Sequence, residues 1–176
     1  MLTRYLKECD ASIKVMLADP TGSSLLHKVL HGVCYTPQQS ERTVRRHRYD
    51  SIVEGVGLDR VTSNFNKGVA SIDGGYRIQD QEIIDTAHWL LHNEGLFVGS
   101  SSALNVAAAV RTAHDLRQSF VQAGEPFRPV RVVTVVCDSG SRHLSRMWNP
   151  EYVRDSYQLT WPDSARLPDC LKLFYN

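Results

Sequence analysis

Three consecutive serines stand at the predicted start of a helix, where side chains either cap the helix or hold a ligand. Ser100, Ser101 and Ser102 follow Gly99 and the short apolar run 96–98. The first amides of a helix lack a partner inside it, so they attract both serine hydroxyls and anionic ligands. Residues 138–141 follow a second apolar run in the same way. Residue types alone favour capping over ligand binding at both places.

A glycine pair and a basic run are two further candidates for binding. Gly55 and Gly57 flank Val56, and this arrangement permits either a turn or close approach of the backbone to a ligand. The run Arg42–Arg48 carries four arginines and could bind phosphate or nucleic acid. Its lack of interleaved aromatic residues favours a solvated surface instead.

The histidines include two pairs at helical spacing, His88 with His92 and His27 with His31. Such a pair can ligate a metal, but no third ligand stands at a suitable distance along the chain. We therefore expect helix-surface histidines and no metal site. His143 stands at a predicted helix start, and its residue type leaves its role open.

Composition excludes several classes of function. A formal net charge of +1 over 176 residues argues against an obligate nucleic-acid binder. No apolar run approaches the roughly 20 residues that span a bilayer, so no membrane association is expected. The four cysteines form no CxxC pair, which favours reduced thiols over structural zinc or a disulfide framework.

The order of predicted elements indicates an α/β fold. Apolar runs predict strands, including a β-branched run at 129–138 of the kind buried on both faces, and the segment 80–95 is the strongest helix, with Asp80 as its N-cap. Alternating strands and helices predict an open, mainly parallel sheet with helices on both faces, in three layers. The length predicts a single domain over 1–176 with an irregular tail over 157–176. The predicted strands are 12–20, 96–98 and 129–138, with strand or hairpin structure around 74–75, and the predicted helices include 2–9, 80–95, 101–120 and one beginning near 139.

Three stretches in the same order resemble one enzyme family. They are "VEGVGLDRVTSNF" (53–65), "EGLFVGSSSALNVAAA" (94–109) and "CDSGSRHLS" (137–145). Together they are similar to the cysteine synthase/cystathionine β-synthase family of pyridoxal-phosphate enzymes, which have the tryptophan-synthase-β-like fold (fold type II). With "YTPQQSERTVRRHRYD" ahead of them, they look closest to the fungal cysteine synthase-like branch.

The resemblance implies a cofactor and the residues that bind it. Ser101 matches the serine that hydrogen-bonds the pyridine nitrogen of pyridoxal phosphate. The segment Gly55-Val56-Gly57 matches a loop beside cofactor and substrate. Cys137 and Asp138 match positions near the far side of the ring. Many members read Ser-Ser-Gly where this chain has Ala at position 103, a change that a first helical turn tolerates.

Other parts of the family pattern are absent from this sequence. None of the five lysines stands in the Ser-x-Lys context of the Schiff-base lysine, and the asparagine loop and glycine-rich phosphate cup are missing. We therefore expect no catalytic residue here. We also expect the chain to be the C-terminal half of a longer enzyme, or a truncated gene product, incomplete in its sheet and inactive alone.

The expected activity of the complete enzyme is the synthesis of L-cysteine and acetate from O-acetylserine and sulfide. A cystathionine β-synthase-like enzyme, and a non-catalytic α/β remnant that acts as a binding partner, remain alternatives. The resemblance implies a small-molecule amino-acid substrate, a homodimer, and a cytoplasmic or mitochondrial location.

Overall fold

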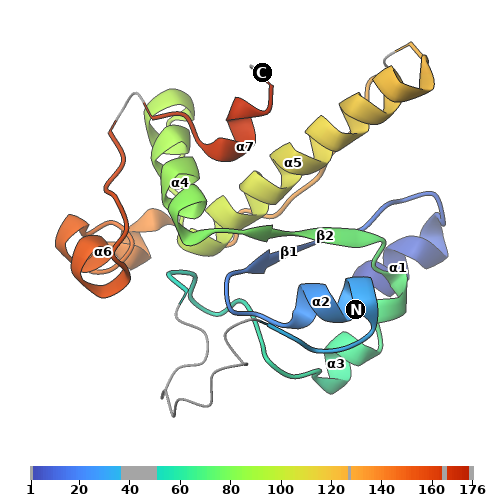
Figure 1. Ribbon diagram of the computed structural model, residues 1–176, viewed down its shortest axis with the longest axis horizontal. Coiled ribbons are helices and arrows are strands. Elements are labelled where there is room, and N and C mark those ends of the chain that lie inside the picture. The colour runs from blue at the N-terminus through green and yellow to red at the C-terminus, as the bar shows by residue number, and fades with distance from the viewer. Residues whose placement is uncertain (1, 37–50, 127, 164–165, 175–176) are drawn as a thin grey trace. The chain divides into compact units, whose positions relative to one another are not determined.

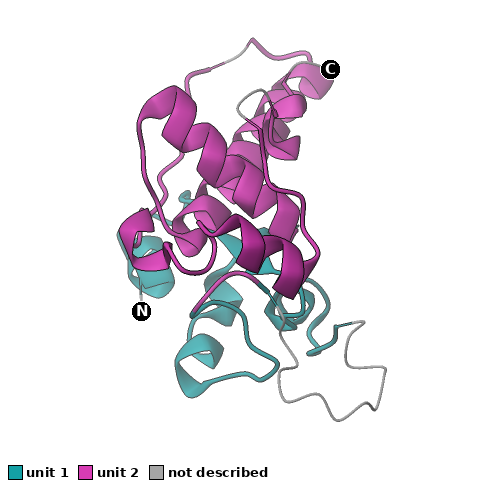
Figure 2. Cartoon of the chain, turned by 90° about the vertical axis from the view of Figure 1, so that its left-hand side faces the viewer, with its two compact units in different colours: residues 1–51, 55–77 teal, residues 52–54, 78–176 magenta. Residues whose placement is uncertain are grey.

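The structure is a computed structural model that describes residues 2–36, 51–126, 128–163 and 166–174 (Figure 1). The basic run 42–48 lies outside these residues. The chain divides into two compact units, one of residues 1–51 and 55–77 and the other of residues 52–54 and 78–176 (Figure 2). Each unit has its own buried side chains.

The first unit is built on a two-stranded parallel sheet. The amide of Asp73 donates to the carbonyl of Val15, 58 residues away, and Gly75 faces Leu17 at the same separation, so the two strands run parallel. A Cβ on Gly75 would lie 2.5 Å from the Leu17 carbonyl oxygen, and this close approach requires glycine. The elements of this unit are α1 (Leu2–Cys9), β1 (Met16–Pro20), α2 (Leu25–His31), α3 (Ser63–Asn66), the 3-10 turn η2 (Val69–Ser71) and β2 (Gly74–Ile78), whose last residue belongs to the second unit.

A buried carboxylate joins the end of β1 to the start of α2. Asp19 is 1% exposed, accepts a hydrogen bond from the Leu26 amide at 2.9 Å and lies 3.6 Å from the Arg77 guanidinium. Burial raises the pKa of Asp19 although these partners oppose the rise. The predicted strand over 12–20 is thus shorter, and it ends where this carboxylate turns the chain into α2.

The second unit is mainly helical, and its core lies between two long helices. α4 (Asp80–Glu94) packs against α5 (Ser100–Ala123), and the contact is made by aliphatic and alanine side chains at helical spacing. The buried side chains of these helices include Ile83, Ile84, Ala87 and Leu90 on α4 and Ala103, Leu104, Ala107 and Ala108 on α5. The remaining elements are the 3-10 turn η3 (Gly140–His143), α6 (Pro150–Tyr157) and α7 (Asp169–Lys172).

The helix predicted over 80–95 is confirmed, but its N-cap is wrong. Gln79 is the N-cap and Asp80 is already helical, because the Asp80 carboxylate accepts from the Ile52 amide at 3.1 Å. Gly95 ends the helix as predicted, with a φ of 68°.

The strand predicted over 129–138 does not form. No backbone group of residues 130–136 bonds to another backbone group among the described residues. Five valines of this run are exposed, and Val133 is 89% exposed. A strand buried on both faces needs neighbouring strands. The run instead receives a side-chain hydrogen bond from α5, from Asn105 to the Val135 carbonyl at 3.0 Å. The predicted strand at 96–98 is likewise reduced to one antiparallel bridge between Val98 and Ser139.

The predicted α/β class with an open parallel sheet and helices is confirmed. The single domain over 1–176 stays a prediction, and the tail after Tyr157 contains the short helix α7. The helix predicted near 139 is replaced by η3, and the next helix begins at Pro150. Among the described residues, no helix combines the length and apolarity that crossing a membrane requires.

Candidate functional site

The three serines occupy the first turn of α5, and none of them is its N-cap. Gly99 is the N-cap, and no side chain caps the helix. The capping interpretation of the serines is therefore wrong. Two of the hydroxyls instead hold neighbouring segments: Ser100 accepts from the Glu54 amide at 3.4 Å, and Ser102 accepts from the Cys137 amide at 2.9 Å.

Ser101 differs from both neighbours. Its side chain is half-buried, and its hydroxyl has no hydrogen-bond partner among the described residues. A hydroxyl at the start of a helix that bonds neither the helix nor a neighbouring segment is available to a ligand. Ser101 is also the one of the three serines that the family resemblance assigns to the pyridine nitrogen of the cofactor.

Asp138 reaches the start of α5 from the segment that follows the valine run. Its carbonyl accepts from the Gly99 amide at 3.1 Å, and its amide lies 3.3 Å from the Ser102 hydroxyl. One carboxylate oxygen, Oδ1, is buried without a hydrogen-bond partner in the described structure. Gly99 makes room for this carboxylate, since a Cβ there would collide with it. The neighbouring Cys137 is exposed, and its sulfur lies 3.5 Å from Nδ2 of the Asn105 side chain.

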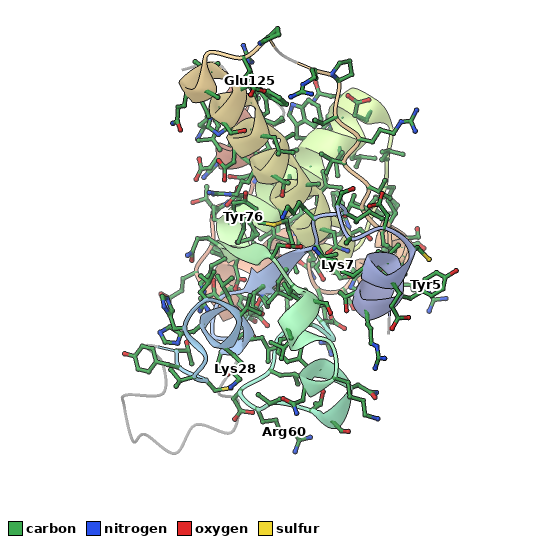
Figure 3. The ribbon with its side chains drawn as sticks, turned by 90° about the vertical axis from the view of Figure 1, so that its right-hand side faces the viewer. Tyr5, Lys7, Lys28, Arg60, Tyr76 and Glu125 are labelled. Atoms are coloured by element: carbon green, nitrogen blue, oxygen red, sulfur yellow. The ribbon has the colours of Figure 1, made fainter. Side chains whose placement is uncertain are left out.

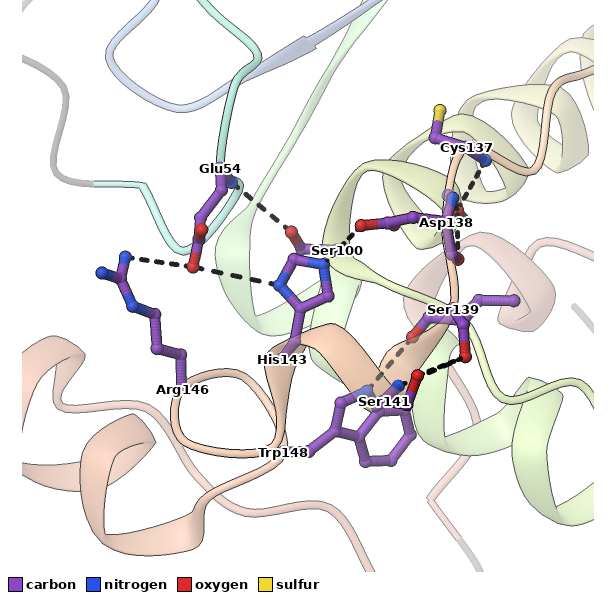
Figure 4. Close-up of polar contacts among 11 residues, drawn as sticks. Glu54, Ser100, Cys137, Asp138, Ser139, Ser141, His143, Arg146 and Trp148 are labelled. Carbon is purple, nitrogen blue, oxygen red and sulfur yellow. Dashed lines mark hydrogen bonds and ion pairs between the residues drawn. The ribbon is translucent and has the colours of Figure 1, made fainter.

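A histidine lies between two carboxylates at this end of α5 (Figure 4). The Nε2 atom of His143 is 2.7 Å from Oδ2 of Asp138, and its Nδ1 atom is 3.9 Å from Oε1 of Glu54. Arg146 contacts the same Glu54 oxygen at 3.0 Å. His143 is 7% exposed, so this network is anchored below the surface. Sequence reasoning left the role of His143 open and missed Glu54.

The Gly55-Val56-Gly57 segment belongs to the first unit, whereas Ser101, Cys137 and Asp138 belong to the second. Both glycines have positive φ, 76° at Gly55 and 91° at Gly57. Gly57 has a packing reason, because a Cβ there would lie 2.8 Å from Pro20. Gly55 has open space around it, so its backbone is accessible.

The lysines of the chain are engaged or exposed at the surface. Lys7 and Lys28 extend from helices of the first unit (Figure 3). Lys7 and Lys14 pair with Asp73, Lys28 donates to the Gly32 carbonyl, Lys172 pairs with Asp169, and Lys67 is exposed.

The predicted histidine pairs are ring contacts. His27 and His31 lie 4.4 Å apart between ring centroids, and His88 and His92 lie 6.2 Å apart. His88 is not a surface residue: it is 6% exposed, and burial lowers its pKa to about 4. Within the described ranges, no three metal-ligating side chains gather into a site.

The sequence is similar to several cysteine synthases. It is 48% identical over 153 residues to cysteine synthase 2 of Schizosaccharomyces pombe, covering 87% of this chain and 36% of that protein. It is 44% identical over 149 residues to cysteine synthase 2 of Neurospora crassa, covering 84% and 30%. Similarity to cystathionine beta-synthase of Apis mellifera is lower, 31% over 113 residues, covering 64% and 19%.

The chain thus spans about a third of the length of the cysteine synthases it matches. The family model described as "Pyridoxal-phosphate dependent enzyme" matches residues 2–138. This range includes the Gly55-Val56-Gly57 segment and the three serines of α5. The match extends from α1 to the carboxylate beside Gly99. The chain belongs to the family of pyridoxal-phosphate-dependent enzymes.

Proposed function

We propose that this chain supplies the C-terminal part of a cysteine synthase, which converts O-acetylserine and sulfide to L-cysteine and acetate. The unpartnered Ser101 hydroxyl, between two serines that hold other segments, is the observation that carries the proposal. The 48% identity to a cysteine synthase supports the choice of reaction. The residues present therefore fit pyridoxal phosphate at the ring-nitrogen end.

Ser101 would donate a neutral hydrogen bond to the pyridine nitrogen of the cofactor. When bound, pyridoxal phosphate supplies the electron sink that lets acetate leave the β-carbon of the substrate. A serine hydroxyl brings no charge to the ring nitrogen, whereas an aspartate would favour its protonated form. This choice restrains carbanion stabilisation and suits elimination followed by addition of sulfide better than transamination.

The other proposed cofactor contacts come from glycine backbone and from the segment after the valine run. Gly55, with nothing within 4 Å of a Cβ position, would allow the backbone of Gly55-Val56-Gly57 to approach the ligand. Cys137 and Asp138 would line the far side of the ring. This placement is supported by the backbone amides of Cys137 and Asp138, which donate to the hydroxyl of Ser102, the residue next to Ser101.

We propose that the 176-residue chain alone has no cysteine synthase activity. The family's lysine and glycine-rich phosphate cup are absent from its sequence, and its own lysines make surface pairs or are exposed. The lysine and the phosphate site would come from polypeptide outside this sequence. The complete enzyme would act as a homodimer on an amino-acid substrate.

Pyridoxal phosphate titrated into the isotope-labelled chain tests the cofactor site. We expect a saturable shift of the Ser101 amide resonance, and an affinity roughly fivefold weaker for Ser101→Ala, since one neutral hydrogen bond contributes about 1 kcal/mol. Ser119→Ala, on the same helix at an exposed position, is the matched control. Equal affinity of both variants and the wild type would reject the assignment of Ser101.

An activity assay tests the inference about the lysine. The chain, with pyridoxal phosphate, O-acetylserine and sulfide, is expected to form no cysteine above the protein-free rate. Borohydride reduction followed by mass spectrometry is expected to leave no specific lysine modified. Cysteine formation together with one modified lysine would show that this chain carries its own catalytic lysine.

The location is proposed to be the cytoplasm or the mitochondrion. A relative from Saccharomyces cerevisiae, 43% identical over 148 residues, is named for the mitochondrion. Fractionation of the source cells, with an antibody to this chain, would distinguish the two compartments.

A further inference from the structure

His143 connects two segments that meet at the start of α5. The connection to residues 137–138 runs through Asp138 at 2.7 Å, and the connection to residues 52–54 runs through Glu54 at 3.9 Å. Each of these segments also donates a backbone amide to a serine hydroxyl of the first turn of α5. The imidazole therefore faces both segments that flank Ser101.

We propose that His143 is a positioning residue of this site: it holds the Asp138 and Glu54 carboxylates together and so fixes the first turn of α5, with the Ser101 hydroxyl. Only the identity of the ligand that Ser101 would bind rests on the proposed function. Asp138, Glu54 and His143 are together called the clasp.

The number of N–H groups on the imidazole determines whether it can donate to one carboxylate of the clasp or to both. A neutral imidazole has one N–H group, and the short contact to Asp138 uses it. Its Nδ1 atom would then be an acceptor that faces the Glu54 carboxylate, which also only accepts. A doubly protonated imidazole has an N–H group for each carboxylate, so the Glu54 contact is favourable only in that state.

The charged groups around His143 fit this description. Asp138 approaches from the segment after the valine run, with Oδ1 buried beside Gly99 at the start of α5, where the helix favours negative charge. Glu54 approaches from residues 52–54 and is shared with Arg146, which is 56% exposed. Glu54 is therefore contacted from the solvent side by Arg146 and from the buried side by His143.

Gly99 gives a second reason why the arrangement is specific. A Cβ at this position would lie 2.7 Å from Nε2 of His143 and closer still to the Asp138 carboxylate. A glycine N-cap therefore allows the Asp138–His143 pair to sit against the first turn of α5. A side-chain cap would occupy the same space.

Amide hydrogen exchange of the 176-residue chain, read residue by residue by NMR, tests the clasp. The Glu54 amide reports the Ser100 contact, the Cys137 amide reports the Ser102 contact, and the Ile84 amide in α4 serves as internal reference. His143→Gln can keep the Asp138 hydrogen bond but has no charge, and His143→Phe loses both contacts. Because partly exposed ion pairs contribute about 0.2–1 kcal/mol, we expect the Glu54 amide of His143→Gln to exchange roughly 1.4- to fivefold faster.

The same experiment separates positioning from simple space filling. His143→Gln should leave the Cys137 amide within about twofold of wild type, whereas His143→Phe should accelerate both amides. Unchanged Glu54 exchange in His143→Gln, or equal acceleration at Glu54 and Ile84 in that variant, would overturn the proposal.

Added pyridoxal phosphate distinguishes failure of this inference from failure of the proposed function. If the cofactor shifts no resonance at Ser101 in the wild type, the proposed function fails, and the exchange rates still decide for or against the clasp. If it binds, His143→Phe should weaken the affinity by at least the factor seen for Ser101→Ala. Equal affinities of wild type and His143→Phe would overturn the positioning role.

Discussion

Replacement of His88 by phenylalanine should make the protein markedly less sensitive to mild acid. His88 is 6% exposed, and its Nε2 atom is buried without a hydrogen-bond partner in the described structure. Its ring packs 4.6 Å from the ring of Trp148 and 4.5 Å from the ring of Trp161, measured between centroids. Burial, with a smaller effect of nearby His92, lowers the pKa of His88 to about 4.

The sign follows from proton binding. The unfolded chain has a histidine pKa of about 6.5, whereas that of folded His88 is about 4. Between these pH values the unfolded chain binds a proton that the folded protein does not bind. Folding stability therefore falls as the pH drops through 6.5, and the loss is complete below about pH 4. The two pKa values give a penalty of about 0.2 kcal/mol at pH 7 and about 2 kcal/mol at pH 5. Local relaxation and water entry reduce this difference, and we expect about 1 kcal/mol.

Urea unfolding followed by tryptophan fluorescence at pH 5, 6 and 7 measures the effect. The stability of His88→Phe relative to wild type should rise by about 1 kcal/mol between pH 7 and pH 5. Comparing one variant at two pH values cancels any packing change that phenylalanine introduces. His92→Gln, at an exposed position, should keep most of the wild-type pH dependence. The reasoning is refuted if His88→Phe and wild type lose stability in parallel.

Three further outcomes follow from other buried or crowded groups. Arg111→Met should lower the free energy of unfolding by about 3 kcal/mol in urea titrations, because it leaves the 2% exposed Glu82 carboxylate without its guanidinium, 2.7 Å away. Gly99→Ala should cost about 1–3 kcal/mol by the same measurement, since its Cβ would lie 2.7 Å from His143 Nε2; an unchanged midpoint would contradict the crowding. Burial raises the pKa of Cys170 to about 11, so a disulfide reagent at pH 8 should modify the two exposed cysteines quickly and Cys170 only in urea.

Local signals in the sequence were sufficient for the two long helices of the second unit, α4 and α5. Apolar residues at helical spacing between Asp80 and Gly95 locate α4 to within a residue, because one face of that helix packs on α5 and Gly95 adopts the left-handed conformation. The N-cap was misplaced since the Asp80 carboxylate has a tertiary partner, the Ile52 amide. No local pattern reveals a partner 28 residues away.

The valine run at 129–138 shows the limit of composition as a guide to strands. β-branched residues predict a strand only where neighbouring strands complete its hydrogen bonds and cover its faces. Here the described contacts of the run come from α5, through Asn105 to the Val135 carbonyl at 3.0 Å and Ser102 to the Cys137 amide. The valines are consequently exposed, and the run remains without ladder hydrogen bonds.

The serines show how far a site can be predicted from sequence. Consecutive residues of a helix are rotated by about 100°, so Ser100 and Ser102 point to different sides and Ser101 points between them. Residue type and spacing establish that geometry, but they do not tell which sides meet another part of the chain. The contacts with Glu54 and Cys137 settle this, because each uses one flanking hydroxyl. Ser101 is left as the hydroxyl of the first turn with no partner among the described residues, and so the first place to look for a ligand.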